Sequence, residues 1–252
     1  MNNWENAVNK FLEQYVNEDY FLGAVLTGSY ATGNNDVNSD IDIFIVTKDS
    51  TPWRERGNKL IDGYLIEYFI NPLRVVLNEF EEGFETGHIA TTRMFSKCKI
   101  IHDKDGTINE LVNKAKQNIN NEIKPLPEFK SKMNSYTIWH SFYELTSRYE
   151  RNEDIDFSYY LYLNDIIDSY FQNKQIPSLP IHKVEKILTN EEFRKRYNIA
   201  KLPDEEFVNK LLKCFKEKEY NKKYEYAKDL YNYYMEQNKD FNINDFEFRS
   251  EI

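Results

Sequence analysis

Residues 26–46 read LTGSYATGNNDVNSDIDIFIV, and this stretch decides how the rest of the chain is interpreted. The apolar run at 21–27 predicts a buried strand that ends at Gly28-Ser29. Gly28 allows a tight turn after that strand, and Ser29 offers a hydroxyl beside main-chain N–H groups at a helix start, where phosphate is favoured. Gly28 and Ser29 are therefore candidate phosphate-binding residues, although Gly-Ser after a strand is also typical of an ordinary turn.

Asp40 and Asp42 stand at the head of the next apolar run, IDIFIV at 41–46, which predicts a second strand. Residues two apart on a strand point to the same face, so the two carboxylates converge. Carboxylates crowded together repel one another, and a divalent cation is the usual compensation. The spacing favours a metal site, whereas an isolated pair of this kind is also typical of a capping aspartate beside a solvated edge residue.

Glu67 supplies a third carboxylate inside YLIEYFI at 64–70, which predicts a third strand. A charge in such an apolar run is costly unless it has a partner. If this strand lies beside 41–46, the three acids form one cluster. The alternative is an alternating strand that turns Glu67 to solvent.

The pattern beyond these strands predicts an α+β protein in two parts. KPLPE at 124–128 breaks the pattern, which places a mixed-sheet domain at 1–124 and a helical bundle at 125–252. Helices are expected at 4–17, 73–83, 86–96, 107–120, 129–150, 157–173, 181–198 and 204–236, the last as two helices, with a short strand at 98–103.

Composition limits the classes of function. The 252 residues leave room for two cores, and the formal net charge of -9 argues against a nucleic-acid partner. Cys98 and Cys214 lack the spacing of a zinc site or disulfide framework, which fits reduced thiols. The first residues do not resemble a signal peptide, and the sequence offers no membrane span, so we expect a cytoplasmic protein without a membrane partner.

The order Gly28-Ser29, ten intervening residues, Asp40-Ile41-Asp42 and then Glu67 on a later strand resembles the DNA polymerase β-type nucleotidyltransferase superfamily. The resemblance implies that the Gly-Ser turn, with Asp40 and Asp42, binds a nucleoside triphosphate as co-substrate. It also implies that the three carboxylates hold one or two Mg²⁺ ions, or Mn²⁺, as catalytic metal ligands.

The length and the two-part division are similar to those of bacterial aminoglycoside (kanamycin-type) and lincosamide nucleotidyltransferases. Their second domain opens with a helix that bears a catalytic Glu and, one turn later, a phosphate-contacting Lys. Here Glu144 and Arg148 are four residues apart, which implies a general base and a nucleotide contact; the alternative is a surface salt bridge. The chain departs from that pattern after Gly-Ser, because Tyr30-Ala31-Thr32 stands where the kanamycin enzyme has a nearby Arg. The resemblance also implies a homodimer.

The expected activity is metal-dependent transfer of a nucleoside monophosphate onto a hydroxyl of a small molecule such as an aminoglycoside or lincosamide. ATP is the first expected donor, and AMP is then the group transferred. One rival is a toxin-like nucleotidyltransferase with an RNA or protein acceptor, which needs a basic or docking surface. The other is a non-catalytic nucleotide-binding protein, which we would expect to lack at least one of the metal-binding carboxylates. All three acids are present.

Overall fold

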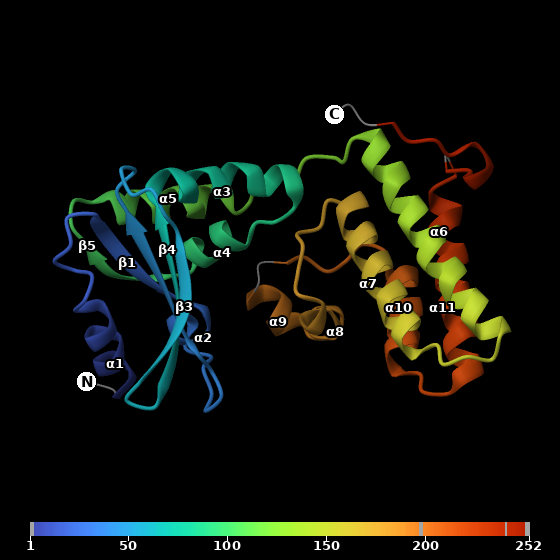
Figure 1. Ribbon diagram of the computed structural model, residues 1–252, viewed down its shortest axis with the longest axis horizontal. Coiled ribbons are helices and arrows are strands. Elements are labelled where there is room, and N and C mark those ends of the chain that lie inside the picture. Colours follow the sequence, from blue (N-terminus) through green and yellow to red (C-terminus); the bar gives the residue numbers. More distant parts are fainter. Residues whose placement is uncertain (1–2, 197–198, 240, 250–252) are drawn as a thin grey trace. The chain divides into compact units, whose positions relative to one another are not determined.

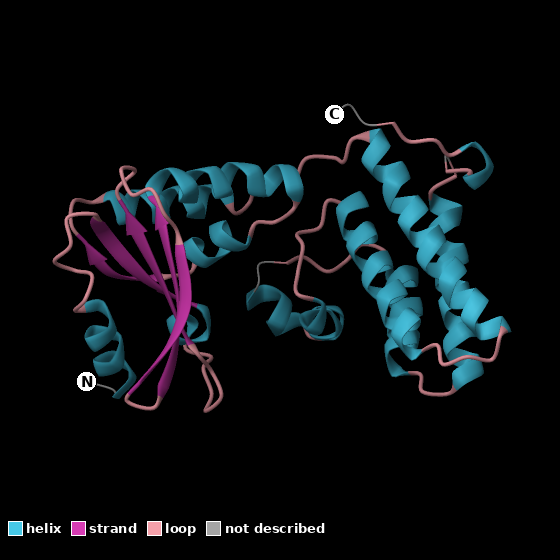
Figure 2. Ribbon diagram, viewed as in Figure 1, coloured by secondary structure: helices cyan, strands magenta, loops and turns pink. Residues whose placement is uncertain are grey.

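The computed structural model describes residues 3–196, 199–239 and 241–249 (Figure 1). The chain forms two compact units, Met1–Glu122 and Ile123–Ile252. The first holds a sheet with helices and the second, as far as it is described, holds helices without a strand, so the predicted α+β class is confirmed (Figure 2). No helix in the described ranges has the length and apolar character needed to cross a membrane.

Five strands form a mixed sheet in the order β3-β4-β2-β1-β5. Only β2 and β4 pair in parallel; the other neighbours pair antiparallel. The strands are β1 (Phe21–Thr27), β2 (Ile41–Thr47), β3 (Glu55–Ile61), β4 (Tyr64–Pro72) and β5 (Lys99–Asp103). The parallel pair lies at the centre of the sheet, which places the heads of two apolar strands side by side.

Helices cover both faces of this sheet, because the central strands are apolar on both sides. Ile41, Ile43 and Ile45 of β2 pack on the face that holds α1 and α2. Phe44 and Val46 point to the other face and pack against α3, α4 and α5. The helices of this unit are α1 (Asn3–Leu12), α2 (Gly28–Thr32), α3 (Leu73–Thr86), α4 (Ala90–Ser96) and α5 (Thr107–Asn118).

The second unit packs its helices around a core rich in tyrosine. Tyr159 and Tyr162 are fully buried, and their hydroxyls donate to the carbonyl oxygens of Cys214 (2.8 Å) and Ala227 (3.1 Å). These bonds offset the cost of burying the hydroxyls. The elements are α6 (Glu128–Glu150), α7 (Asp156–Asn173), α8 (Ile181–Thr189), α9 (Glu191–Arg196), α10 (Glu205–Lys216), α11 (Tyr220–Gln237) and a short 3₁₀ helix, η1 (Ile243–Asp245).

Two expectations about helices were wrong, and one strand was missed. The opening helix ends at Leu12 rather than near residue 17, and the chain continues in turns. The helix expected at 181–198 is two helices, because the Asn190 side chain accepts from the Phe193 N–H and begins α9; residues 197 and 198 lie outside the described ranges. The missed strand is β3, which was not predicted from the sequence.

Candidate active site at the head of the parallel strands

The turn after β1 is shaped by a close approach between Gly28 and Asp42. Gly28 begins α2 with φ of +65°, in the left-handed region that favours glycine. A Cβ at this position would lie 1.9 Å from Oδ2 of Asp42. The half-buried Ser29 follows as the second residue of α2, and the Thr27 side chain makes no capping bond. The main chain of the turn therefore lies directly against the Asp42 carboxylate.

The three predicted carboxylates come together. Asp42 is the direct partner of Glu67 in the parallel register of β2 and β4, and Asp40 immediately precedes β2. One carboxylate oxygen from each residue lies within 4.8 Å of the other two, and all three residues are half-buried. On the other side, Asp42 is paired with Thr27 of β1, the residue before Gly28. Register alone thus joins the Gly-Ser turn to the acidic cluster.

The cluster fits a hard divalent cation by its donor set. All its donors are carboxylate oxygens, which Mg²⁺ and Mn²⁺ prefer. Oxygens on opposite sides of one such ion lie about 4–5 Å apart, the scale of the separations found here. Three carboxylates at this spacing repel one another, and a bound cation would relieve that repulsion.

Arg56 is a member of this site that the sequence analysis missed. Its Nη2 and Nε donate to Oε1 of Glu67 at 2.6 and 3.2 Å. Its guanidinium also lies 4.7 Å from the ring centroid of Phe69. Arg56 belongs to β3, so it reaches Glu67 across the β3-β4 pair. The Asp62-Gly63 turn between these strands, with φ of +51° and +83°, is the sequence signal that reveals such a hairpin.

Glu144 and Arg148 lie on α6 in the second unit, and both are exposed. Arg148 Nη1 lies 3.4 Å from Oε2 of Glu153. Within the described ranges no ion pair joins Glu144 to Arg148, so the salt bridge that was the alternative explanation of their spacing is not formed. The Glu144 carboxylate remains available to solvent.

A family model described as a nucleotidyltransferase domain matches residues 8–137. This range contains the Gly28 turn, the three carboxylates and Arg56. Among solved structures, a nucleotidyltransferase-like protein from Exiguobacterium sibiricum 255-15 matches with a TM-score of 0.48 and 10% identity, over 93% of this chain and 75% of that chain. No curated protein matches the chain.

Proposed function

Since the chain belongs to the nucleotidyltransferase domain family, we propose that this nucleotidyltransferase moves a nucleoside monophosphate from a nucleoside triphosphate onto a hydroxyl of a small molecule. The expected donor is ATP, and the expected metal is Mg²⁺ or Mn²⁺. The observation that carries the proposal is the register that sets Asp42 beside Glu67 while Gly28 touches Asp42.

In this proposal each residue of the turn and the cluster has a role. Asp40, Asp42 and Glu67 hold the divalent cation, which when bound would offset the negative charge of the triphosphate. Gly28 and Ser29 present main-chain N–H groups and a hydroxyl to the phosphate oxygens. Arg56 holds Glu67 in one orientation through two hydrogen bonds to a single oxygen, which leaves Oε2 of Glu67 for the cation.

The transfer itself is a substitution at phosphorus. The acceptor oxygen forms a bond to the α-phosphorus, the bond from that phosphorus to the bridging oxygen of the β-phosphate breaks, and pyrophosphate leaves. The acceptor hydroxyl loses its proton as it attacks, and we assign that proton to the carboxylate of Glu144. Arg148 would contact the nucleotide phosphates after it releases Glu153.

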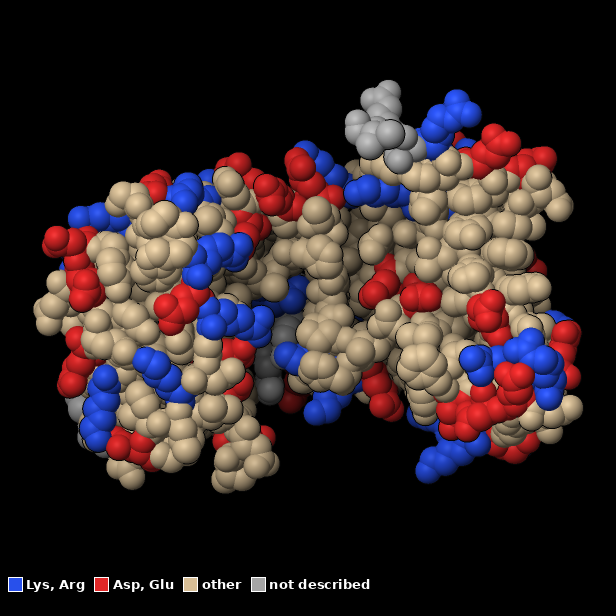
Figure 3. Space-filling model, viewed as in Figure 1, with Lys and Arg blue, Asp and Glu red and all other residues tan. Residues whose placement is uncertain are grey.

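A small polycationic or polar acceptor suits the charge of this protein. The net charge of -9 attracts cations, and an aminoglycoside is a polycation. Lincosamides are the second class of drug acceptor under this proposal. An RNA acceptor would need a continuous basic surface, and on the face drawn in Figure 3 acidic and basic side chains are interspersed over the described residues. A protein acceptor would need a docking surface. As a separate point, we propose that the protein assembles as a homodimer.

The test is a screen for pyrophosphate release with ATP and the other triphosphates against aminoglycosides and lincosamides. Wild type should release pyrophosphate with one acceptor class, only in the presence of Mg²⁺ or Mn²⁺. Asp42→Asn should lower the rate by about 10²–10³-fold and abolish metal-dependent nucleotide binding in calorimetry. Metal-independent turnover, or an Asp42→Asn protein with unchanged metal dependence, would remove the central claim.

A further inference from the structure

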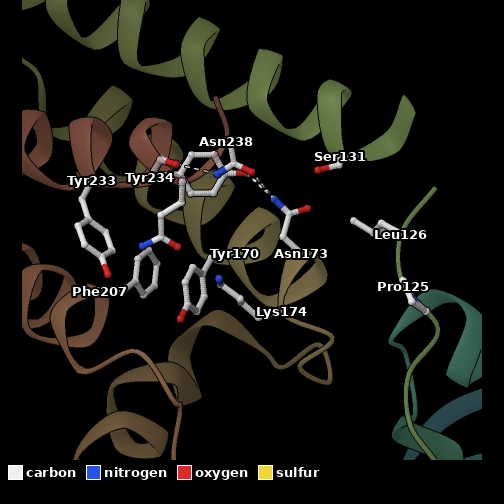
Figure 4. Close-up of a pocket in the computed structure, with 11 residues that line it drawn as sticks. Pro125, Leu126, Ser131, Tyr170, Asn173, Lys174, Phe207, Tyr233, Tyr234 and Asn238 are labelled. Carbon is white, nitrogen blue, oxygen red and sulfur yellow. Dashed lines mark hydrogen bonds between the residues drawn. The ribbon is translucent and has the colours of Figure 1, made fainter. Parts of the chain in front are cut away.

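The second unit contains a cavity of about 260 Å³ that no step of the proposed transfer uses. It lies where α6 begins, with Ser131, and where α7 and α11 end, with Asn173 and Asn238 (Figure 4). The chain before α6 closes one side, and a hydrogen bond of 2.5 Å from Gln175 Nε2 to the carbonyl of Ile123 ties that segment to the end of α7. All the residues that line the cavity belong to this unit.

One wall of the cavity is aromatic and uncharged. The rings of Tyr170 and Phe207 stack with centroids 3.6 Å apart and an interplanar angle of 5°, and both residues are buried. Burial, and then the nearby Asp204 carboxylate, raise the pKa of Tyr170, so its hydroxyl stays protonated at neutral pH. The Tyr233 hydroxyl donates to the Asp204 carboxylate at 2.8 Å, so its proton is already used.

A hydrogen-bond network fixes the orientation of the Asn173 amide. Asn238 Nδ2 donates to the main-chain oxygen of Tyr234 at 2.7 Å, so the side-chain oxygen of Asn238 must accept. It accepts from Asn173 Nδ2 at 3.4 Å, and the same nitrogen donates to the Tyr234 hydroxyl at 2.9 Å. The Asn173 oxygen therefore points the other way, toward the side on which Ser131 and Leu126 lie in Figure 4.

That oxygen is buried and accepts no hydrogen bond from the described residues. A buried acceptor without a donor is costly, and a ligand that brings an N–H or O–H group recovers the cost. Lys174 is the only charged side chain among the residues that line the cavity, so a cationic donor is disfavoured. The Lys174 ammonium and the Ser131 hydroxyl are suited to a ligand carbonyl.

We propose that this cavity is a second small-molecule site, for a neutral, planar molecule whose amide or lactam presents an N–H to Asn173 beside a carbonyl oxygen. The aromatic wall favours a flat ring, and the volume limits the ligand to a small molecule. The proposal goes beyond nucleotidyl transfer and does not depend on it.

The test uses the full chain and a matched pair of probes. Benzamide and acetophenone share the ring and the carbonyl, but a methyl group replaces the amide nitrogen in acetophenone. Saturation-transfer NMR titration should show that benzamide binds about three- to tenfold more tightly than acetophenone. This is the ratio of dissociation constants that one buried hydrogen bond produces. Equal affinities, or no binding of either probe up to its solubility, would overturn the proposal.

Two variants locate the binding. Ser131→Phe fills the cavity from α6 and should abolish binding of both probes, whereas Thr137→Phe, on an exposed position of the same helix, should leave it unchanged. Asn173→Leu removes the acceptor and should equalise the two affinities. If Asn173→Leu does not fold, the probe pair and Ser131→Phe still decide: a Ser131→Phe protein that binds benzamide as wild type does would place the ligand elsewhere.

Discussion

Arg56 donates two hydrogen bonds to a single oxygen of Glu67, from Nη2 at 2.6 Å and from Nε at 3.2 Å. Glu67 is the third carboxylate of the cluster, with a side chain that is 20% exposed, while the Arg56 side chain is 69% exposed. The solvent-exposed Arg56 guanidinium thus orients the half-buried Glu67 carboxylate, and Glu67 is the neighbour of Asp42 in the sheet. This pair connects the edge strand β3 to the acidic cluster at the centre of the sheet.

Replacing Arg56 should change metal binding and turnover in opposite directions. In Arg56→Ala we expect Mn²⁺ to bind severalfold more tightly without nucleotide, because a like charge beside Glu67 is removed. We expect kcat to fall about tenfold, since the Glu67 carboxylate loses its orientation. Calorimetry with Mn²⁺ and steady-state kinetics measure the two effects.

Lys59→Ala is the matched control for Arg56. Lys59 is also a basic residue of β3, but it donates to Gln14 at 2.8 Å and lies near the ring of Phe11, on the opposite face of the sheet. Its loss should leave both metal affinity and kcat unchanged. Arg56→Lys should restore part of kcat, and a kcat for Arg56→Ala equal to that of wild type would show that the pair is only a surface contact.

Alanine substitutions at Gly28 and Gly33 separate the effect of backbone strain from the effect of a steric collision with Asp42. Both have positive φ, +65° and +70°, so alanine should cost about 1 kcal/mol of stability at either position. Only at Gly28 would the new methyl collide with the Asp42 carboxylate; at Gly33 nothing lies within 4 Å. Gly28→Ala should therefore lose at least about tenfold in kcat/KM, and Gly33→Ala should keep it.

Denaturant unfolding and pyrophosphate release test this pair. Similar activity losses in the two variants would show that strain in the turn, rather than its approach to the carboxylate, governs the site.

The strands that carry the cluster could be predicted because burial leaves a plain mark on them. The runs that contain Ala24, Ile43 and Ile70 are apolar since helices cover both faces of the central sheet. The meeting of Asp42 with Glu67 was a conditional prediction, which required 64–70 to lie beside 41–46, and the parallel register meets that condition. The roles of these acids in catalysis stay predictions.

The edge strand β3 could not be recognised from its composition. Its sequence, ERGNKLI, is polar because one edge and much of its surface face solvent, so it is a strand only through its pairing with β4. Arg56 was missed for that reason, since its contact with Glu67 exists only across that pair. The break at Asn190 was missed because the surrounding residues keep helical spacing and only the side-chain cap reveals the new start.

Buried tyrosines and a buried thiol predict loss of stability in alkali. Burial raises the pKa of Tyr234 from 10.0 to about 12 and that of Cys214 from 9.0 to about 12. Because each folded pKa exceeds the unfolded one, the stabilisation is complete below about pH 9 and is lost as the pH rises toward 12. The last part of the tyrosinate absorbance, which reports the buried tyrosines, should appear together with loss of helical circular dichroism. Tyr160→Phe, at an exposed position, should leave the midpoint of helix loss unchanged. Ionisation of the last tyrosines without helix loss would contradict the prediction.

The assignment of the base is the last prediction, and it depends on Glu144. This residue is an exposed acid on α6, and within the described ranges its carboxylate makes no ion pair that would hold it in another role. Glu67 is a poor alternative, because its Oε1 accepts two hydrogen bonds from Arg56 and its other oxygen is assigned to the proposed cation. On any acceptor found in the screen, Glu144→Gln should therefore lower kcat by about 10²–10⁴-fold while nucleotide affinity is kept. Glu150→Gln, at an exposed acid of the same helix, should turn over as wild type does.

The pH dependence of the rate distinguishes a general base from a residue that only binds substrate. If Glu144 is the base, the wild-type rate rises with pH through one ionisation, and Glu144→Gln should lose that rise. If Glu144→Gln keeps full kcat with nucleotide binding intact, the proton goes elsewhere and this helix is structural.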